Sequence, residues 1–257
     1  MNLVVLGSGT AHPHPKRSSA AFWLETAGGI VLLDIAASAP HRLAQERLDW
    51  GNIDAIWVSH FHLDHCAGLA PFLFATRHAP ETLARTKPLK IFGGKGLREL
   101  VDTFNKAGGG KVLEQLFPIE IIEIEPLENF EMLAGVSAIA MSTPHTENSH
   151  TIRIEDHTGT TLVYTSDTGF RKDVSVFAKE ADLLIIESSF VRDKKSEKHL
   201  ELAEAMYLIR QAKPKRAILT HLYAEWDLVD FRDEIARFDP ICEVIEAFDG
   251  LRLSIPK

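Results

Sequence analysis

The segment "VSHFHLDHCAGL" (residues 58–69) places three histidines and one aspartate within six residues. The apolar run "AIWV" precedes it directly and is typical of a buried strand. Buried polar side chains need partners, so His60, His62, Asp64 and His65 are not explained as ordinary core residues. Imidazole nitrogens and carboxylate oxygens are ligands that zinc accepts. The segment therefore predicts a metal centre whose remaining ligands come from elsewhere in the chain.

The spacing within this segment suggests two neighbouring ions. In an extended His-x-His segment the alternate side chains point the same way, so His60 and His62 can bind one ion. The chain then turns, and Asp64 and His65 can face a second ion. This mixture of ligands favours zinc, with manganese or iron as substitutes.

Three further polar residues follow apolar runs later in the chain. His145 follows "VSAIAMSTP", Asp167 follows "TLVYTS", and His221 follows "RAILT". Each residue alone is more often a cap or a surface residue. Together with residues 60–65 they complete a ligand set for two metals, and an aspartate such as Asp167 can bridge two ions.

The order H-x-H-x-D-H, "PH", "TSDTG" and "LTHL" resembles the metallo-β-lactamase superfamily over nearly the whole chain. The resemblance implies an α/β fold, a four-layer αββα sandwich, and a cofactor of two zinc ions. The ligands implied are His60, His62 and His145 for the first ion, Asp64, His65 and His221 for the second, and Asp167 as the bridge.

Within that superfamily the chain is most similar to the ribonuclease Z and cyclic-phosphate phosphodiesterase branch. "VLLDIA" implies that Asp34 supports residues 60–65, the metal loop. "LLIIESSF" implies that Glu187 orients a ligand histidine. "KHLELAEA" followed by "LTHL" makes His199 the match for a catalytic histidine. "PHPKRSS" resembles a phosphate-contacting loop with Lys16 and Arg17 as its basic pair.

The chain departs from that branch at two points. Leu200 and Glu201 follow His199, where ribonuclease Z has Ser-Thr or a similar pair. The interval from His145 to Asp167 holds only two predicted strands and a hairpin turn at "EDHTGT". The tRNA-processing enzymes carry a long protruding arm in that interval, so we expect the arm to be absent here.

The same residues predict the catalytic roles. A pair of metal ions about 3.5–4 Å apart acidifies bound water to a pKa of about 7. Asp64 can accept the proton of the water, and His199 would protonate the leaving alkoxide. Ser196 is predicted as a helix N-cap, which would place His199 in the first turn, where the helix dipole disfavours its cationic form.

Apolar runs and helical periodicity predict the elements that position these residues. Strands are expected at 3–6, 21–25, 30–34, 55–59, 89–92, 119–124, 136–141, 151–155, 161–166, 182–187, 216–220 and 242–246. Helices are expected at 38–48, 96–107, 197–212 and 227–238. This order predicts one domain over residues 1–257, with two sheets packed face to face and helices outside.

The composition of the chain limits which partners it is expected to bind and in which compartment it is expected to occur. The chain has 257 residues, 45% of them hydrophobic and 25% charged, and a formal net charge of −8, which disfavours binding to long nucleic acid. Cys66 and Cys242 are the only cysteines, so neither a disulfide framework nor a thiolate zinc cluster is predicted. No apolar run suits a membrane span or a signal peptide, and a cytoplasmic protein is expected.

The leading functional hypothesis is a zinc-dependent phosphodiesterase that acts on a small or cyclic phosphodiester. A ribonuclease Z-type tRNA 3′-end endonuclease is the alternative, and a lactonase or thioesterase could use the same metal site. A non-catalytic metal-binding protein is disfavoured, because seven candidate ligands exceed the four that close a structural zinc site. A homodimer is left open.

Overall fold

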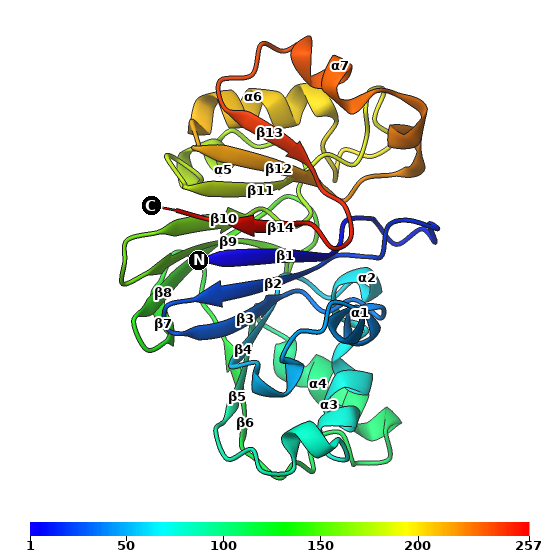
Figure 1. Cartoon of the computed structure of the whole chain (residues 1–257), viewed down its shortest axis with the longest axis vertical. Helices are drawn as coiled ribbons and strands as arrows, with labels where there is room; N and C mark the ends of the chain where they lie inside the picture. The colour runs from blue at the N-terminus through cyan, green and yellow to red at the C-terminus, as the bar shows by residue number, and fades with distance from the viewer. Residues whose placement is uncertain (257) are drawn as a thin grey trace.

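The computed structural model describes residues 1–256, which form two seven-stranded sheets (Figure 1). In spatial order the first sheet contains β14 (Arg252–Ser254), β1 (Asn2–Gly7), β2 (Ala21–Thr26), β3 (Gly29–Leu33), β4 (Ala55–Val58), β5 (Leu89–Gly93) and β6 (Ile119–Glu123). The second contains β13 (Glu243–Glu246), β12 (Arg216–Thr220), β11 (Leu183–Glu187), β10 (Thr161–Tyr164), β9 (His150–Asp156), β8 (Val136–Ser142) and β7 (Asn129–Leu133).

Each sheet has an antiparallel half and a parallel half. Strands β1 to β3 pair antiparallel, whereas β3 to β6 run parallel. In the second sheet β7 to β10 pair antiparallel, and β10 to β13 run parallel. Strands β8, β10, β11 and β12 therefore point the same way, so their carboxyl ends meet at one edge of the sheet.

The main core lies between the sheets. Phe22 and Trp57 from the first sheet and Tyr164 and Ile185 from the second belong to one buried cluster. Every residue of β4, β10 and β11 is buried. Central parallel strands are covered on both faces, and this explains why these strands read as continuous apolar runs.

Helices cover the outer face of each sheet (Figure 1). The first sheet carries α1 (Ala39–Gln45), α2 (Leu63–Cys66), α3 (Leu69–Thr76) and α4 (Leu97–Ala107), and the second carries α5 (Asp173–Phe177), α6 (Leu202–Ala212) and α7 (Phe231–Ala236). The short 3₁₀ segments are η1 (Trp50–Asn52), η2 (Pro80–Thr82) and η3 (Ala224–Leu228). The αββα prediction is therefore confirmed.

Within residues 1–256, no helix is long and apolar enough to cross a membrane.

All twelve predicted strands are present, with ends that agree within two residues. The short or partly exposed strands β7 and β14 and the helices α2, α3 and α5 were not predicted from the sequence. The helix predicted over 227–238 is divided into η3 and α7.

The predicted start of α6 is wrong, and Ser196 is not its N-cap. The helix begins at Leu202, because Glu201 and Glu204 form a capping box that satisfies the first backbone N–H groups. Backbone hydrogen bonds between Phe190 and residues 200 and 202 form an isolated bridge directly before the helix. Ser196 Oγ instead accepts a hydrogen bond from the backbone N–H of residue 198.

Candidate metal centre

The seven predicted metal ligands lie together at the carboxyl ends of strands from both sheets. His60, His62, Asp64 and His65 follow β4 in the first sheet. Residues 145, 167 and 221 follow β8, β10 and β12 in the second. Their ligand atoms form two groups, each of which lies within a 4.8 Å span.

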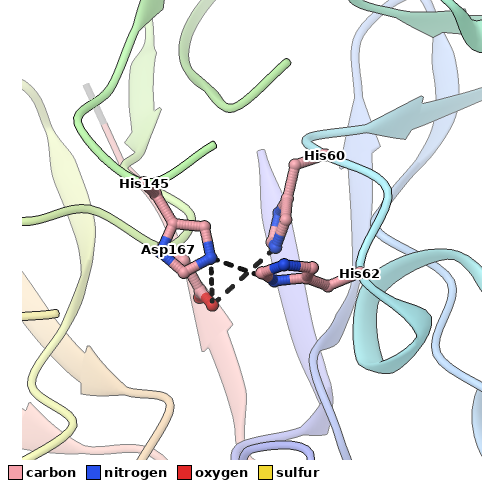
Figure 2. A group of neighbouring side chains, drawn as sticks. All are labelled: His60, His62, His145 and Asp167. Carbon is pink, nitrogen blue, oxygen red and sulfur yellow. Dashed lines mark hydrogen bonds and ion pairs between the residues drawn. The ribbon is translucent and has the colours of Figure 1, made fainter. Parts of the chain in front are cut away.

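The first group contains His60, His62, His145 and Asp167 (Figure 2). His145 Nε2 lies 3.0 Å from His62 Nδ1 and 3.6 Å from Asp167 Oδ2. His60 Nε2 lies 3.8 Å from Asp167 Oδ2. Figure 2 shows the three rings pointing toward one another above the carboxylate.

The second group contains Asp64, His65, Asp167 and His221. His65 Nε2 lies 3.3 Å from Asp167 Oδ1 and 3.7 Å from Asp64 Oδ2. His221 Nε2 lies 3.5 Å from Asp64 Oδ2 and 3.3 Å from Asp167 Oδ2. Asp167 is therefore the residue shared by both groups, as expected of a bridge.

The geometry fits metal ions. Zinc–nitrogen bonds of about 2.0–2.1 Å in a tetrahedral site place neighbouring ligand atoms roughly 3.4 Å apart, close to the spacings found here. Four buried ligand atoms have no hydrogen-bond partner among the described residues: His60 Nε2, His65 Nε2, Asp167 Oδ1 and His221 Nε2. A buried polar atom without a hydrogen-bond partner is energetically unfavourable. Cations bound between these four atoms would provide each of them with a partner.

The Asp34 carboxylate contacts His65, a candidate ligand from the first sheet. Its Oδ2 accepts hydrogen bonds from His65 Nδ1 at 2.7 Å, Ser59 Oγ at 2.8 Å and the Tyr164 hydroxyl at 2.7 Å, while its Oδ1 accepts the backbone N–H of Ser59. Because Nδ1 donates to Asp34, the neutral form of the His65 ring has its Nε2 lone pair facing the ligand group. Asp34 thus contacts Ser59 and His65 directly, and its support of a metal loop stays a prediction.

The Glu187 carboxylate contacts Ser189 and His199 on the second-sheet side of the centre. Its Oε1 accepts a hydrogen bond from His199 Nδ1 at 3.1 Å, and its Oε2 accepts one from Ser189 Oγ at 2.6 Å. Ser189 Oγ in turn lies 3.0 Å from His221 Nδ1 and accepts its proton. Glu187 therefore contacts His199 directly and the candidate ligand His221 through one hydroxyl.

Burial and neighbouring charge shift the pKa values of the ligands. Burial holds the pKa of His60 well below its ordinary value, and the pKa of His145 is lowered for the same reason. Burial also opposes charge on His65, but the carboxylates of Asp167 and Asp34 outweigh it and raise the pKa of His65 well above the usual value. Although burial disfavours its anion, His221 and His65 hold the pKa of Asp167 well below normal. The centre therefore favours a bound positive charge.

Three residues at the strand ends have left-handed backbone conformations. Asp34, Ser166 and His221 have φ angles of 57°, 54° and 57°. Such conformations cost non-glycine residues of order 1–3 kcal/mol each and concentrate at functional sites. Here they turn the chain sharply where each strand reaches the centre.

A close backbone contact fixes the metal loop. The backbone N–H of Ile35 donates to His65 O at 2.7 Å, and that of Gly68 donates to Ile35 O at 2.8 Å. A Cβ atom at Gly68 would lie only 2.2 Å from Ala36 O. Glycine is therefore required for the loop to approach the end of β3.

Cys66 lies inside the metal loop but is not suited to bind metal. Its thiol donates to the backbone carbonyl of Phe61, and burial raises its pKa to about 12. The thiolate is the form that binds metals. The two candidate ligand groups thus offer nitrogen and oxygen atoms.

His199 lies beside the second ligand group, in the non-helical segment before α6. Its ring stacks on that of His221 with centroids 5.3 Å apart. Burial disfavours the cation, but the hydrogen bond and negative charge of Glu187 outweigh it and raise the pKa of His199. The expected lowering by a helix dipole is wrong, because His199 lies outside the helix.

The loop with Lys16 and Arg17 is held by ion pairs. The Arg17 guanidinium is buried and contacts Asp227 Oδ1 at 2.7 Å and Glu246 Oε1 at 3.4 Å. His14 Nε2 contacts the other oxygen of Asp227 at 2.8 Å. Lys16 is exposed. Arg17 thus ties the loop to η3 and β13.

Several residues around the centre were not predicted from the sequence. Ser59, Ser166 and Ser189 contact ligand histidines, and the only sequence signal is their position within two residues of a predicted ligand or supporting residue. Tyr223 is half-buried and stacks on Phe190 with ring centroids 5.0 Å apart, which forms a wall next to His199 and His221. No pattern in the sequence identified this wall.

A family model described as "Anti-Pycsar protein Apyc1" matches residues 1–238. The chain belongs to this family. It lies in the ribonuclease Z-like branch of the metallo-β-lactamase superfamily.

Curated relatives cover almost all of the chain. A ribonuclease Z from Shouchella clausii is 27% identical over 296 aligned positions, which cover 93% of both chains. A ribonuclease Z from Thermococcus onnurineus is 24% identical and covers 95% of this chain and 91% of its own. Together with the site, these relatives identify the protein as a metal-dependent hydrolase.

Solved structures share the fold. Human short-form tRNase Z (ELAC1) superposes with a TM-score of 0.81 at 24% identity and full coverage of both chains. The metallo-β-lactamase fold protein YhfI from Bacillus subtilis gives 0.79 at 22% identity, covering 98% of this chain and 99% of its own. A diphosphatase from the PhnP family gives 0.76 at 20% identity, covering 99% and 98%.

Proposed function

We propose that this hydrolase is a dinuclear zinc phosphodiesterase that cleaves a small or cyclic phosphodiester. The observation that carries the proposal is the pair of four-residue ligand groups that share Asp167, with unpaired buried ligand atoms facing inward. His60, His62 and His145 would hold one ion, and Asp64, His65 and His221 the other. Manganese or iron could replace zinc with this ligand set.

The residues around the ions supply the remaining chemistry. Bound divalent ions would neutralise charge on phosphate oxygens and make a water molecule acidic at neutral pH. Asp64 can accept the proton of that water. His199 uses Nδ1 to donate to Glu187, so its Nε2 is free to deliver a proton to the leaving alkoxide. The raised pKa of His199 supports this role as an acid.

The small substrate follows from what the centre lacks around it. The strands β9 and β10, which lie between His145 and Asp167, are joined by residues 157–160 alone. No arm for holding a tRNA body occurs in this described interval. The net charge of −8 also opposes a long polyanion.

A ribonuclease Z-type tRNA 3′-end endonuclease is the second candidate. Its support is the similarity to ribonuclease Z along 93% of the chain. A lactonase or thioesterase would use the same metal groups but has less use for an acid such as His199. The phosphate contact predicted for Lys16 and Arg17 stays a prediction, and the ion pairs of Arg17 favour a role in holding the loop.

A substrate panel separates these candidates. Metal-loaded protein would be assayed with bis-p-nitrophenyl phosphate, an alkyl cyclic phosphodiester, a lactone and a precursor tRNA, with Asp167→Ala as the inactive control. We expect hydrolysis of the phosphodiesters and about two zinc equivalents per chain by elemental analysis. Hydrolysis of the lactone alone, or a firm single equivalent unchanged by added zinc, would contradict the proposal.

A further inference from the structure

The end of β10 brings three polar side chains to the centre from the second sheet. In the segment Tyr164-Thr165-Ser166-Asp167, Asp167 is the shared ligand candidate. Tyr164 and Ser166 are both buried, and both reach across to residues of the first sheet. They donate to different residues next to the ligand groups, Tyr164 to Asp34 and Ser166 to Ser59.

Tyr164 contacts the support of the second ligand group. Its hydroxyl donates to Asp34 Oδ2 at 2.7 Å, and the same oxygen accepts the proton of His65 Nδ1 at 2.7 Å. All three side chains are fully buried or nearly so. With the Ser59 contacts, the carboxylate accepts four hydrogen bonds, so its orientation is completely determined.

Ser166 contacts the support of the first ligand group. Its hydroxyl donates to Ser59 Oγ at 2.6 Å, and Ser59 Oγ lies 3.1 Å from His60 Nδ1. Ser59 Oγ gives its own proton to Asp34, so it must accept from His60. Ser166 Oγ itself lies 3.4 Å from His60 Nδ1.

We propose that Tyr164 is a positioning residue for the second metal group, acting through Asp34 on His65, and that Ser166 performs the equivalent role for the first group through Ser59 on His60. This inference rests on the proposed two-metal function. One strand end of the second sheet thereby sets the orientation of ligands that belong to the first sheet. Loss of one hydroxyl should weaken one metal group and spare the other.

Two matched substitutions test this selectivity. Tyr164→Phe and Ser166→Ala each remove one buried hydroxyl from the same strand end, and Tyr207→Phe, on the outer helix α6, is the control. Metal-free protein would be titrated with Co²⁺ and with Zn²⁺ against a competing chelator. Loss of a partner behind a ligand histidine typically costs 10–100-fold in metal affinity.

Ligand variants show which group is affected. In His145→Ala only the second group stays complete, and in His221→Ala only the first. We expect Tyr164→Phe to weaken Co²⁺ binding by roughly 10–100-fold in the His145→Ala background and to leave it unchanged in the His221→Ala background. Ser166→Ala should show the opposite pattern.

Two results would reject the role of Tyr164, and a third would reject the two-metal proposal instead. A merely structural role for Tyr164 predicts a lower melting temperature of the metal-free protein and equal losses of affinity in both backgrounds. Unchanged affinity in both backgrounds would also reject it. A wild-type protein that takes up one equivalent would instead reject the two-metal proposal, because that result does not depend on Tyr164.

Discussion

At the scale of single residues, the candidate ligands and the carboxylates of Asp34 and Glu187 could be predicted from the sequence, but the hydroxyl groups that contact them could not. The H-x-H-x-D-H spacing of His60, His62, Asp64 and His65, directly after an apolar run, predicts a metal site by residue type alone. Ser59 directly follows β4 and Tyr164 ends β10, and their contacts depend on which strand end of the other sheet faces them. Hydrogen bonds between residues more than 100 positions apart leave no local pattern.

Asp167 should matter more to the centre than Asp34. Asp167→Ala removes a ligand from both groups, whereas Asp34→Ala leaves every ligand in place and removes the acceptor behind His65. We expect Asp167→Ala to abolish activity and Asp34→Ala to cost roughly 10–100-fold. Rates with bis-p-nitrophenyl phosphate and zinc content after gel filtration measure this. Equal activity of the two variants would show that the roles are assigned wrongly.

His199 should act as a general acid and not as a metal ligand. A basic alkoxide leaving group needs a proton, whereas p-nitrophenolate does not. His199→Ala should therefore slow hydrolysis of an alkyl phosphodiester by roughly 10²–10⁴-fold and affect a p-nitrophenyl ester much less. The exposed His157→Ala is the matched control, and zinc content should equal that of the wild type. Equal losses on both substrates, or a lost ion, would leave His199 as a binding or ligand residue.

At the scale of elements, the strands were predictable because buried apolar runs specify them directly. The start of α6 was not, because apolar periodicity begins before Leu202 while two contacts outside the pattern decide the boundary. The Glu201–Glu204 capping box and the bridge between Glu201 and Phe190 start the helix after His199 and leave this residue outside it. This boundary places the histidine next to Glu187, which explains its raised pKa.

The loop before β2 depends on Arg17 for its position. Because the guanidinium is buried against Asp227 and Glu246, Arg17→Ala should lower the free energy of unfolding by about 1–3 kcal/mol. In a chain of this size each kcal/mol corresponds to roughly 2–4 °C in Tm, which differential scanning fluorimetry can measure. Lys16→Ala, at the exposed neighbour, should leave Tm unchanged. If Arg17→Ala instead raised KM without changing Tm, a direct phosphate contact would be supported.

At the scale of the whole molecule, the centre exists only where the two sheets meet. The first sheet supplies the metal loop and the second supplies His145, Asp167 and His221, so neither half contains a complete group. The sheet order could not be predicted residue by residue, although the alternation of strands and helices predicted the sandwich. The buried contact from Tyr164 to Asp34 joins the sheets directly behind the ligands.

The same architecture predicts weak binding to long RNA. A formal charge of −8 opposes association with a polyanion, and the short connection between β9 and β10 offers no extended surface to offset that repulsion. Mobility-shift titration with a precursor tRNA at moderate salt should show no complex at roughly 1 µM protein, because non-specific contacts alone give dissociation constants of about 10⁻⁴–10⁻⁶ M. A small cyclic phosphodiester should be hydrolysed by the same preparation, which controls for intact metal centres. Micromolar or tighter RNA binding, together with correct 3′-end cleavage, would instead favour the endonuclease, because it would show that the fold positions tRNA without the arm.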